Sequence, residues 1–201
     1  MNTIRFRVLG DSLAAGVGCT QVEQSIGHLL AGRLRAEGHR VDLAVYAVPG
    51  ARSADLPPQV RAAVRAGVDL ALVVVGANDL TRFIPPAVGA GQLHDAVADL
   101  TRAGAHTIAV TAPDLAVLGH VPPAFREMVS QASRTYAKAQ AAAVVRAGGA
   151  VAVIDPAVFD RFATDERLFS PDRFHPSAAG YALIAQSLAP QVLAHSGRAA
   201  G

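Results

Sequence analysis

Hydrophobic positions along the chain fall into five short runs rich in valine, isoleucine and leucine. These runs have the length and the β-branched content of strands, and they cover 4–9, 41–48, 70–75, 107–111 and 151–154. The segments between and after them have helical composition, at 22–37, 54–66, 92–104, 125–148 and 177–194. Strands and helices therefore alternate along the chain.

This alternation predicts an α/β fold whose parallel strands are joined by right-handed crossovers. The runs 70–75 and 107–111 are apolar at consecutive positions, as is typical of parallel strands covered on both faces. We therefore expect a three-layer α/β/α sandwich around a five-stranded parallel sheet, in the flavodoxin-like order 2-1-3-4-5. Ser53 and Ser177 are the expected N-caps of the second and the last helix.

The composition fits one well-packed domain. The chain has 201 residues, of which 51% are hydrophobic and 17% charged, and a mean hydropathy of +0.30, which excludes the disorder signature. We expect a single domain over 1–201, with a core of about 4–194 and a short flexible C-terminal tail. No apolar run reaches the roughly 20 residues of a membrane helix, so no membrane span is expected. The single cysteine, Cys19, excludes an internal disulfide framework and a cysteine-built metal site.

Charge and glycine spacing argue against two classes of ligand. The net charge is only +2, and the arginines are scattered singly, so a nucleic-acid partner is not expected. The turn after the first strand, 10–18, has five residues between Gly10 and Gly16 and no following lysine, unlike a P-loop. Gly16 and Gly18 lack the third glycine of a dinucleotide fingerprint. Nucleotide binding is therefore not expected.

The residues that carry chemistry follow the strands, on loops that meet at the carboxyl edge of the predicted sheet. Ser12 follows the first strand, and its hydroxyl needs a neighbouring base to become a nucleophile. His175, in the loop before the last helix, is a suitable base, and Asp172 can accept the proton of its other ring nitrogen. An oxyanion would then meet three donors: the Ser12 N–H, the Gly50 N–H and the Asn78 amide.

These blocks resemble a known family. Gly10-Asp11-Ser12-Leu13, Gly50, Gly76-Ala77-Asn78-Asp79 and the pair Asp172 and His175 look, in that order, like the four sequence blocks of the SGNH (GDSL-type) hydrolases. The resemblance implies that Ser12 is the nucleophile, His175 the base and acid, Asp172 its orienting carboxylate, and Gly50 and Asn78 oxyanion donors. It also implies that no metal or organic cofactor is needed. The chain departs from the family at one point: Pro49 precedes Gly50, where the family often has a polar residue.

We predict a serine esterase that hydrolyses small-molecule esters of small or medium acyl groups through an acyl-enzyme on Ser12. The same residues would also serve an acyltransferase or a carbohydrate O-deacetylase, and a non-catalytic binding module on this fold is a further alternative. An α/β-hydrolase is disfavoured, because its second motif glycine is replaced by Ala14. The loops 83–91, 112–124 and 156–171 should shape the pocket, with largely apolar residues: Phe83, Ile84, Pro85, Pro86, Leu115, Val117, Leu118, Phe159 and Phe162.

Other polar residues near these loops have simpler expected roles. We expect Asp11, Asp79 and Asp155 to bind loop backbone, and Arg52, Arg82 and Arg173 to be solvated. Cys19 is expected to be a small apolar core residue. The remaining histidines show no metal-ligand spacing: His28, His39, His94, His106, His120 and His195.

The position of Ser12 bears on localisation. A cleaved signal peptide occupies roughly the first 15–30 residues, so its removal would remove Ser12. A full-length chain would therefore be cytoplasmic, whereas a mature domain of a longer protein would be secreted. The oligomeric state is not predicted.

Overall fold

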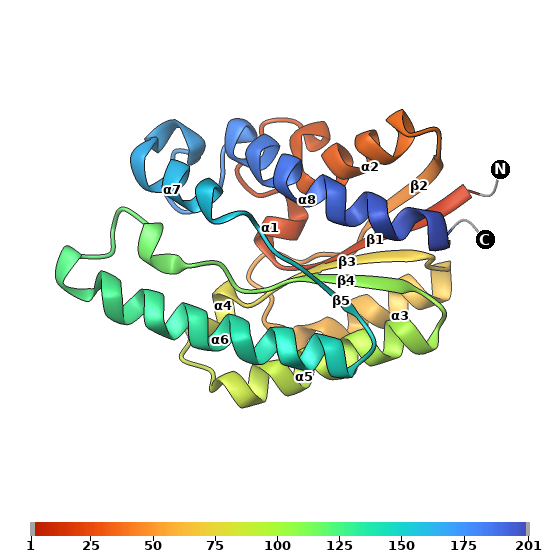
Figure 1. The fold of residues 1–201 in the computed structure, drawn as a ribbon, viewed down its shortest axis with the longest axis horizontal. Coiled ribbons are helices and arrows are strands. Elements are labelled where there is room, and N and C mark those ends of the chain that lie inside the picture. The colour runs from red at the N-terminus through yellow and green to blue at the C-terminus, as the bar shows by residue number, and fades with distance from the viewer. Residues whose placement is uncertain (1–2, 200–201) are drawn as a thin grey trace.

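A parallel sheet of five strands, in the order β2-β1-β3-β4-β5, forms the middle layer of the structure (Figure 1). The structure is a computed structural model that describes residues 3–199, with side chains up to Ser196. The strands are β1 (Thr3–Gly10), β2 (Arg40–Val45), β3 (Leu70–Val74), β4 (His106–Val110) and β5 (Ala150–Ala152). The predicted fold class and sheet order are confirmed. The strand expected over 41–48 ends at Val45; Pro49, which has no N–H, stops the ladder soon after.

The helices surround this sheet on both faces. They are α1 (Ser12–Ala15), α2 (Ile26–Ala36), α3 (Leu56–Ala66), α4 (Ala77–Thr81), α5 (Pro86–Arg102), α6 (Arg126–Arg146), α7 (Pro156–Thr164) and α8 (Ala178–Ala199). Five of them, α2, α3, α5, α6 and α8, were predicted, whereas the short helices α1, α4 and α7 were not. The last helix continues past 194 to Ala199, so part of the expected flexible tail is helical, and the rest lies outside the described residues.

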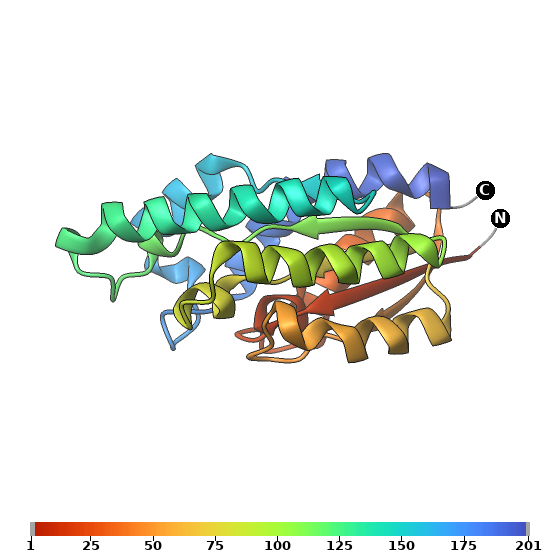
Figure 2. The ribbon, with the colours of Figure 1, turned by 90° about the horizontal axis from the view of Figure 1, so that it is seen from below.

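Two apolar cores separate the sheet from its helix layers. On one face, Phe6, Val8 and Leu72 pack against α2, α7 and α8. On the other, Leu9 and Val73 pack against α3, α5 and α6. Figure 2 shows α3, α5 and α6 lying side by side across that second face. Strands covered on both faces must be apolar at consecutive positions, which explains the continuous hydrophobic runs of β3 and β4.

Two predicted loops are partly helical. The helix expected from 92 starts at Pro86, because a proline at the first helical position has no N–H to leave unpaired. A proline at the first helical position also starts α7, at Pro156. The Asp155 carboxylate caps this helix by accepting a hydrogen bond from the Ala157 N–H at 2.9 Å. The loops 83–91 and 156–171 are therefore shorter than expected.

The two predicted N-caps have different outcomes. Ser177 caps α8, since its hydroxyl accepts a hydrogen bond from the Gly180 N–H at 3.3 Å. The Ser53 prediction is wrong: α3 starts at Leu56, after a short 3-10 turn, and the fully buried Ser53 hydroxyl donates to Asp79. A cap pattern cannot distinguish a serine that starts a helix from one that bonds another loop.

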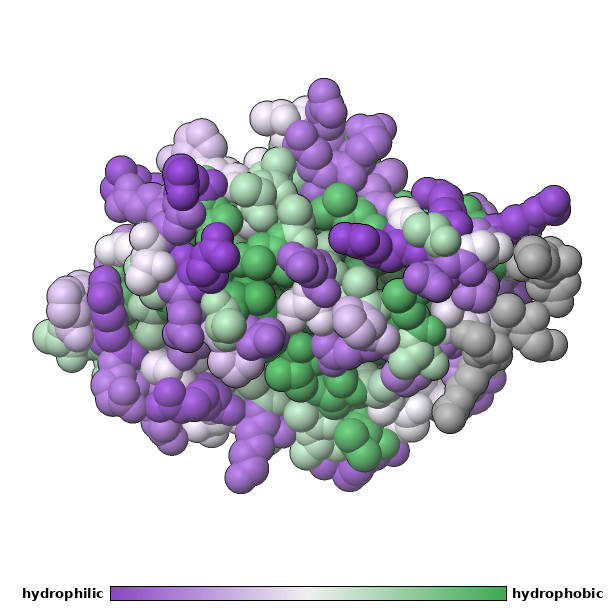
Figure 3. All heavy atoms as spheres, turned by 45° about the horizontal axis from the view of Figure 1, so that its top comes forward, coloured by the Kyte–Doolittle hydropathy of each residue, from purple (hydrophilic) through white to green (hydrophobic). Residues whose placement is uncertain are grey.

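On the face drawn in Figure 3, hydrophobic residues extend from the middle of the surface to its lower part, with hydrophilic residues among and beside them. Among the residues that the structure describes, no helix combines the length and apolarity needed to cross a membrane.

The end of α4 contains a strained aromatic residue. The Ile84 N–H donates to the Asp79 carbonyl at 2.9 Å and the Phe83 N–H to the Leu80 carbonyl at 3.0 Å, which is the Schellman pattern. Phe83 therefore occupies the left-handed position, at φ 54°, that glycine normally takes. Its side chain is 92% exposed, so the ring contributes little packing in return.

Replacing Phe83 with glycine is expected to stabilise the fold. Left-handed backbone costs a non-glycine residue about 1–2 kcal/mol, and glycine avoids this cost. The stabilisation gained exceeds the loss from the extra conformational entropy that glycine gives the unfolded chain. We expect thermal unfolding to shift upward by about 2 °C. Phe83→Ala removes the ring but keeps the strain, so it is the matched control and should not raise Tm. An equal rise in both variants would contradict this explanation.

Candidate active site

Ser12 lies just after the carboxyl end of β1, as the first residue of α1. Gly10 makes this turn possible: at φ 133°, a Cβ on it would lie 1.8 Å from the Val74 carbonyl oxygen. The Asp11 N–H continues the pairing with β3 through a 3.0 Å bond to that oxygen. The Asp11 carboxylate caps α1 by accepting from the Leu13 N–H at 2.9 Å. The chain therefore leaves the sheet abruptly, with Ser12 at the turn.

Asp11 is itself buried, with 2% of its surface exposed. Burial raises the pKa of its carboxyl group to about 7, and the negative charge of Asp79 adds to the increase. Its contacts are those of a capping residue, in agreement with the expected role.

The Ser12 hydroxyl, His175 and Asp172 form a continuous hydrogen-bonded chain. His175 Nδ1 lies 2.6 Å from Asp172 Oδ2, and His175 Nε2 lies 2.9 Å from Ser12 Oγ. Since the carboxylate can only accept, Nδ1 carries the proton in this arrangement and Nε2 accepts the hydrogen bond from the serine. The side chain of His175 is 19% exposed, so solvent reaches it only in part.

Asp172 is fixed by hydrogen bonds within the turn 170–175. Its Oδ1 accepts hydrogen bonds from the Ser170 hydroxyl at 2.7 Å and from the Phe174 and His175 N–H groups at 2.9 Å each. Burial by itself would raise the pKa of Asp172, but the His175 ring and these other donors outweigh it and hold the pKa well below its usual range. The carboxylate is therefore charged at neutral pH, with only Oδ2 facing the imidazole.

A second contact fixes this turn against the nucleophile loop. The fully buried Tyr181, on α8, donates its hydroxyl proton to the Val17 carbonyl at 2.8 Å. Gly18 permits the close approach, because a Cβ there would lie 2.3 Å from the Pro176 carbonyl oxygen. The His175 loop and the Ser12 loop, far apart in sequence, are thereby held together.

Asn78 projects from α4, just after β3. Gly76 precedes it at φ 133°, in a position where a Cβ would lie 2.8 Å from Ala112 and Gln140. The Asn78 side-chain amide donates one hydrogen bond to the Ala51 carbonyl at 3.0 Å. Its second N–H has no acceptor among the described residues, so it remains available to a ligand.

Gly50 lies in the loop that Asn78 holds. At φ 81° it adopts the left-handed conformation, and its N–H has no acceptor among the described residues. The neighbouring Ser53 N–H donates to the buried Asp79 carboxylate at 3.0 Å, which ties the same loop to α4. Asp79 thus holds neighbouring loops together, as expected. The structure brings all four predicted loops to one edge of the sheet.

A cavity opens beside Ser12 and His175. The expected residues Leu115, Val117, Leu118, Phe159 and Phe162 line it. The prediction that Phe83, Ile84, Pro85 and Pro86 also line it is wrong, because the chain after α4 turns away from the cavity and leads directly into α5. Val158 and Phe169, from the predicted loop 156–171, also line it. Other lining residues lie outside the three predicted loops: Leu13, Ile154, Phe174, Pro176 and Ile184.

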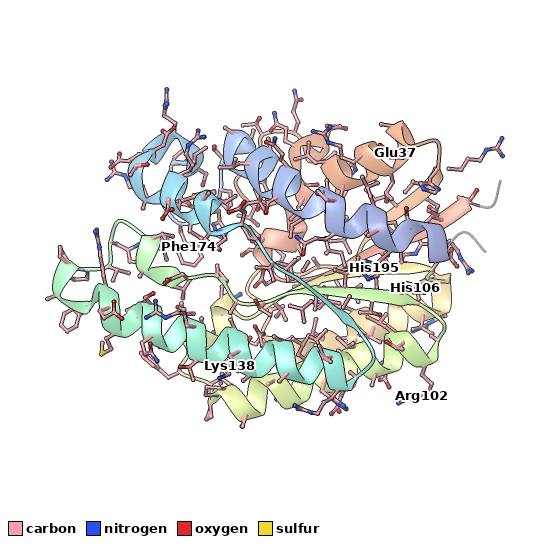
Figure 4. The ribbon with its side chains drawn as sticks, in the orientation of Figure 1. Glu37, Arg102, His106, Lys138, Phe174 and His195 are labelled. Atoms are coloured by element: carbon pink, nitrogen blue, oxygen red, sulfur yellow. The ribbon has the colours of Figure 1, made fainter. Side chains whose placement is uncertain are left out.

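The remaining histidines lie outside this site or at its rim. Figure 4 shows Phe174 near α7 and the loop after β4, whereas His106 and His195 lie toward the end of the sheet near the termini. His120 is exposed and stacks on Phe174, with ring centroids 6.3 Å apart, without lining the cavity. Among the described residues, no group of three or more histidine, cysteine or acidic side chains is arranged to hold a metal ion.

The other polar residues of the loops make mostly local contacts. Arg52 lies 3.4 Å from Asp55, and Arg173 is solvated, at 3.8 Å from Glu166. Arg82 is exposed. Cys19 is half-buried and packs against the first core, close to its expected role.

Comparison with known proteins agrees with this geometry. A family model described as the GDSL-like lipase/acylhydrolase family matches residues 8–183. A GDSL-like esterase of Mycobacterium tuberculosis is 36% identical over 189 residues, which cover 92% of this chain and 60% of that protein. The chain thus spans less than two thirds of that relative's length.

Two solved structures share the fold. The psychrotrophic esterase EstA from Pseudoalteromonas sp. aligns with a TM-score of 0.75 at 20% identity, covering 98% of this chain and 100% of that one. An acetylxylan esterase from Geobacillus stearothermophilus aligns with a TM-score of 0.75 at 14% identity, covering 94% of each chain. With a family model that matches most of its length, this chain belongs to the GDSL-like lipase/acylhydrolase family, as its four sequence blocks predicted.

Proposed function

We propose that this protein is a serine esterase that hydrolyses small-molecule esters of short acyl groups. The observation that carries the proposal is the hydrogen-bonded chain from the Ser12 hydroxyl through His175 to Asp172, with links of 2.9 and 2.6 Å. Ordered in this way, the three side chains make a serine nucleophilic at neutral pH.

In the first step, Ser12 Oγ attacks the ester carbonyl carbon while its proton passes to His175 Nε2. The carbonyl π electrons move onto oxygen and form a tetrahedral oxyanion. The charged Asp172 stabilises the imidazolium that results. When the oxyanion collapses, the bond to the alcohol oxygen breaks, and His175 returns the proton to the departing alcohol.

In the second step, water replaces the alcohol. His175 takes a proton from the water molecule, whose oxygen attacks the acyl-enzyme carbonyl. Collapse of this second tetrahedral intermediate releases the carboxylic acid and returns the proton to Ser12 Oγ. The half-buried position of His175 gives water access to the acyl-enzyme while the apolar cavity shields the acyl group.

Three donors are proposed to bind the oxyanion. They are the Ser12 N–H, the Gly50 N–H and the Asn78 side-chain N–H that does not bind Ala51. Asn78 is preorganised for this role, because its bond to the Ala51 carbonyl fixes the plane of its amide. The same bond fixes the chain next to Gly50, so the two donors are set relative to each other.

The cavity limits the acyl group. Its volume is about 90 Å³, and its lining is mostly aliphatic and aromatic. An apolar cavity of about 150 Å³ holds a benzene molecule, so this one suits a chain of a few carbons. We propose that the acyl group occupies the cavity and that the alcohol extends toward solvent.

A chain-length series tests this assignment. We expect kcat/KM for aryl esters to be highest for acetyl to butyryl groups and to fall for longer acyl chains. Sugar acetates and thioesters belong in the same series, since an acetyl group on a sugar also fits the cavity. Product analysis with an added alcohol acceptor separates the alternatives: acyl transfer to the alcohol in preference to water would identify an acyltransferase. Highest activity on long acyl chains would overturn the proposed acyl specificity.

Replacing Asn78 with alanine tests the oxyanion site. Loss of one oxyanion donor typically lowers turnover by about 10²–10³. We expect kcat to fall by this factor with KM nearly unchanged, because the bond strengthens only as charge develops on the oxygen. Steady-state kinetics on an acetyl ester measures both constants. A rise in KM with unchanged kcat would contradict the role.

A further inference from the structure

Three glutamines share one kind of contact at the carboxyl edge of the sheet. Each extends from a covering helix and binds backbone N–H and C=O groups where strands end. Gln191, on α8, binds both groups of Val153 after β5, at 2.9 and 2.8 Å. Gln140, on α6, accepts from the Ala112 N–H at 2.7 Å and donates to the Val75 carbonyl at 3.1 Å. Gln59, on α3, binds both backbone groups of Gly10 at the end of β1.

Gln59 binds the residue that precedes the nucleophile turn. The Gly10 N–H donates to Gln59 Oε1 at 2.7 Å, and Gln59 Nε2 donates to the Gly10 carbonyl at 3.0 Å. The side chain is 4% exposed, so its amide depends on these partners in place of water. The Gly10 carbonyl also accepts from the Val48 N–H at 3.0 Å. Gln59 and Val48 thus meet at one carbonyl oxygen.

This meeting point lies between two proposed oxyanion donors. Ser12 is two residues after Gly10, and Gly50 is two residues after Val48. Gly10 needs support from outside the sheet, since its φ of 133° departs from strand geometry. The loop that contains Gly50 is also held by Asn78, whose amide binds the Ala51 carbonyl. Gln59 plays the corresponding part for the Ser12 turn, through its two hydrogen bonds to Gly10.

We infer that Gln59 is a positioning residue, which fixes the Ser12 N–H and the Gly50 N–H at the spacing that an oxyanion requires. The inference rests on the proposed function. Misplacement of a reacting group by about 1 Å can cost about 10²-fold in rate, so a small shift of Gly10 has a large effect on turnover. Gln59 has no contact with the substrate in this proposal and acts through Gly10 alone.

The test compares Gln59→Met with Gln191→Met. Both changes replace a glutamine that binds one backbone N–H and C=O pair with an unbranched apolar side chain, but Val153 lies outside the Ser12 site. We expect kcat of Gln59→Met to fall about 10- to 100-fold on an acetyl ester, with KM within about 2-fold of wild type. Gln191→Met should keep a kcat within about 2-fold of wild type. Thermal unfolding of both variants reports how much each glutamine's pair of backbone hydrogen bonds stabilises the fold.

Gln59→Glu provides a second variant for the case that the methionine protein does not fold. A protonated glutamate has the donor and acceptor of the amide, whereas the ionised form places a carboxylate oxygen against the Gly10 carbonyl. We expect its kcat, relative to wild type at the same pH, to rise as the pH is lowered from 9 to 6. A variant-to-wild-type ratio that does not change with pH would overturn the inference.

The inference is also overturned if Gln59→Met and Gln191→Met lose kcat equally, or if Gln59→Met lowers Tm without lowering kcat. Failure of the proposed function would look different. In that case the wild-type protein itself would not react with a phosphonate ester at Ser12, whatever residue stands at position 59.

Discussion

Replacing Ser12 with alanine should abolish ester hydrolysis, with a loss of at least about 10⁴-fold in kcat. The loss is this large because the triad acts as a unit, so that His175 and Asp172 have no nucleophile to activate once the hydroxyl is gone. Residual turnover would come from direct attack of water on an ester whose carbonyl oxygen is bound by the oxyanion donors, which by itself gives weak catalysis. The fold should be unaffected, since Ser12 follows the end of β1 and, among the described residues, its hydroxyl bonds only His175.

The measurement is hydrolysis of an acetyl aryl ester, together with labelling by a reactive phosphonate detected as a mass increase on the peptide that contains Ser12. Ser187→Ala is the matched control. It removes a serine hydroxyl that accepts from the Asp155 N–H at 2.8 Å, outside the site, and should keep full activity and labelling. Turnover by Ser12→Ala near the wild-type rate, with labelling of another residue, would refute the assignment of the nucleophile.

Replacing Asp172 with asparagine should lower kcat by about 10⁴-fold. The structure gives the reason. Because Oδ1 accepts from Ser170 and two backbone N–H groups, the amide oxygen of asparagine will take that position. Its NH₂ group then faces His175 Nδ1, which must accept, and the ring proton moves to Nε2. The histidine can no longer take the proton of Ser12, and no carboxylate stabilises an imidazolium.

Steady-state kinetics across pH 6–9 checks this expectation, since the wrong tautomer is not corrected at any pH in that range. Asp165→Asn is the matched control. Asp165 also accepts from a backbone N–H two residues later and pairs with a basic side chain, Arg167 at 2.8 Å, but it does not contact His175. A decrease of less than about 10-fold for Asp172→Asn would show that the proposed carboxylate role is wrong.

Much of the fold was predictable because it depends on short-range pattern. Parallel strands buried on both faces need consecutive apolar residues, and β3 and β4 have them. The short helices α1, α4 and α7 were missed, since helices of four to nine residues are too short for a hydrophobic period. Ser53 has the residue type of a helix cap, and only the position of Asp79 shows that it has another partner.

The site residues were predictable from their chemistry and order, whereas the residues that position them were not. A glutamine within a helix, such as Gln59, has no local signal, because its partner Gly10 lies 49 positions earlier in the chain. The same holds for the Tyr181 contact with Val17 and for the part of the cavity lined by packed helices.

The sequence by itself thus determined the class of fold, the order of the strands and the residues able to form a nucleophile, a base, an acid and oxyanion donors. These follow from hydrophobic period and residue type, which are local properties. The tertiary structure decided which serines bond which partners, that Phe83 faces solvent and not the cavity, and how the Ser12 and Gly50 loops are held. Those depend on distances between segments remote in sequence, set by helix packing around the sheet.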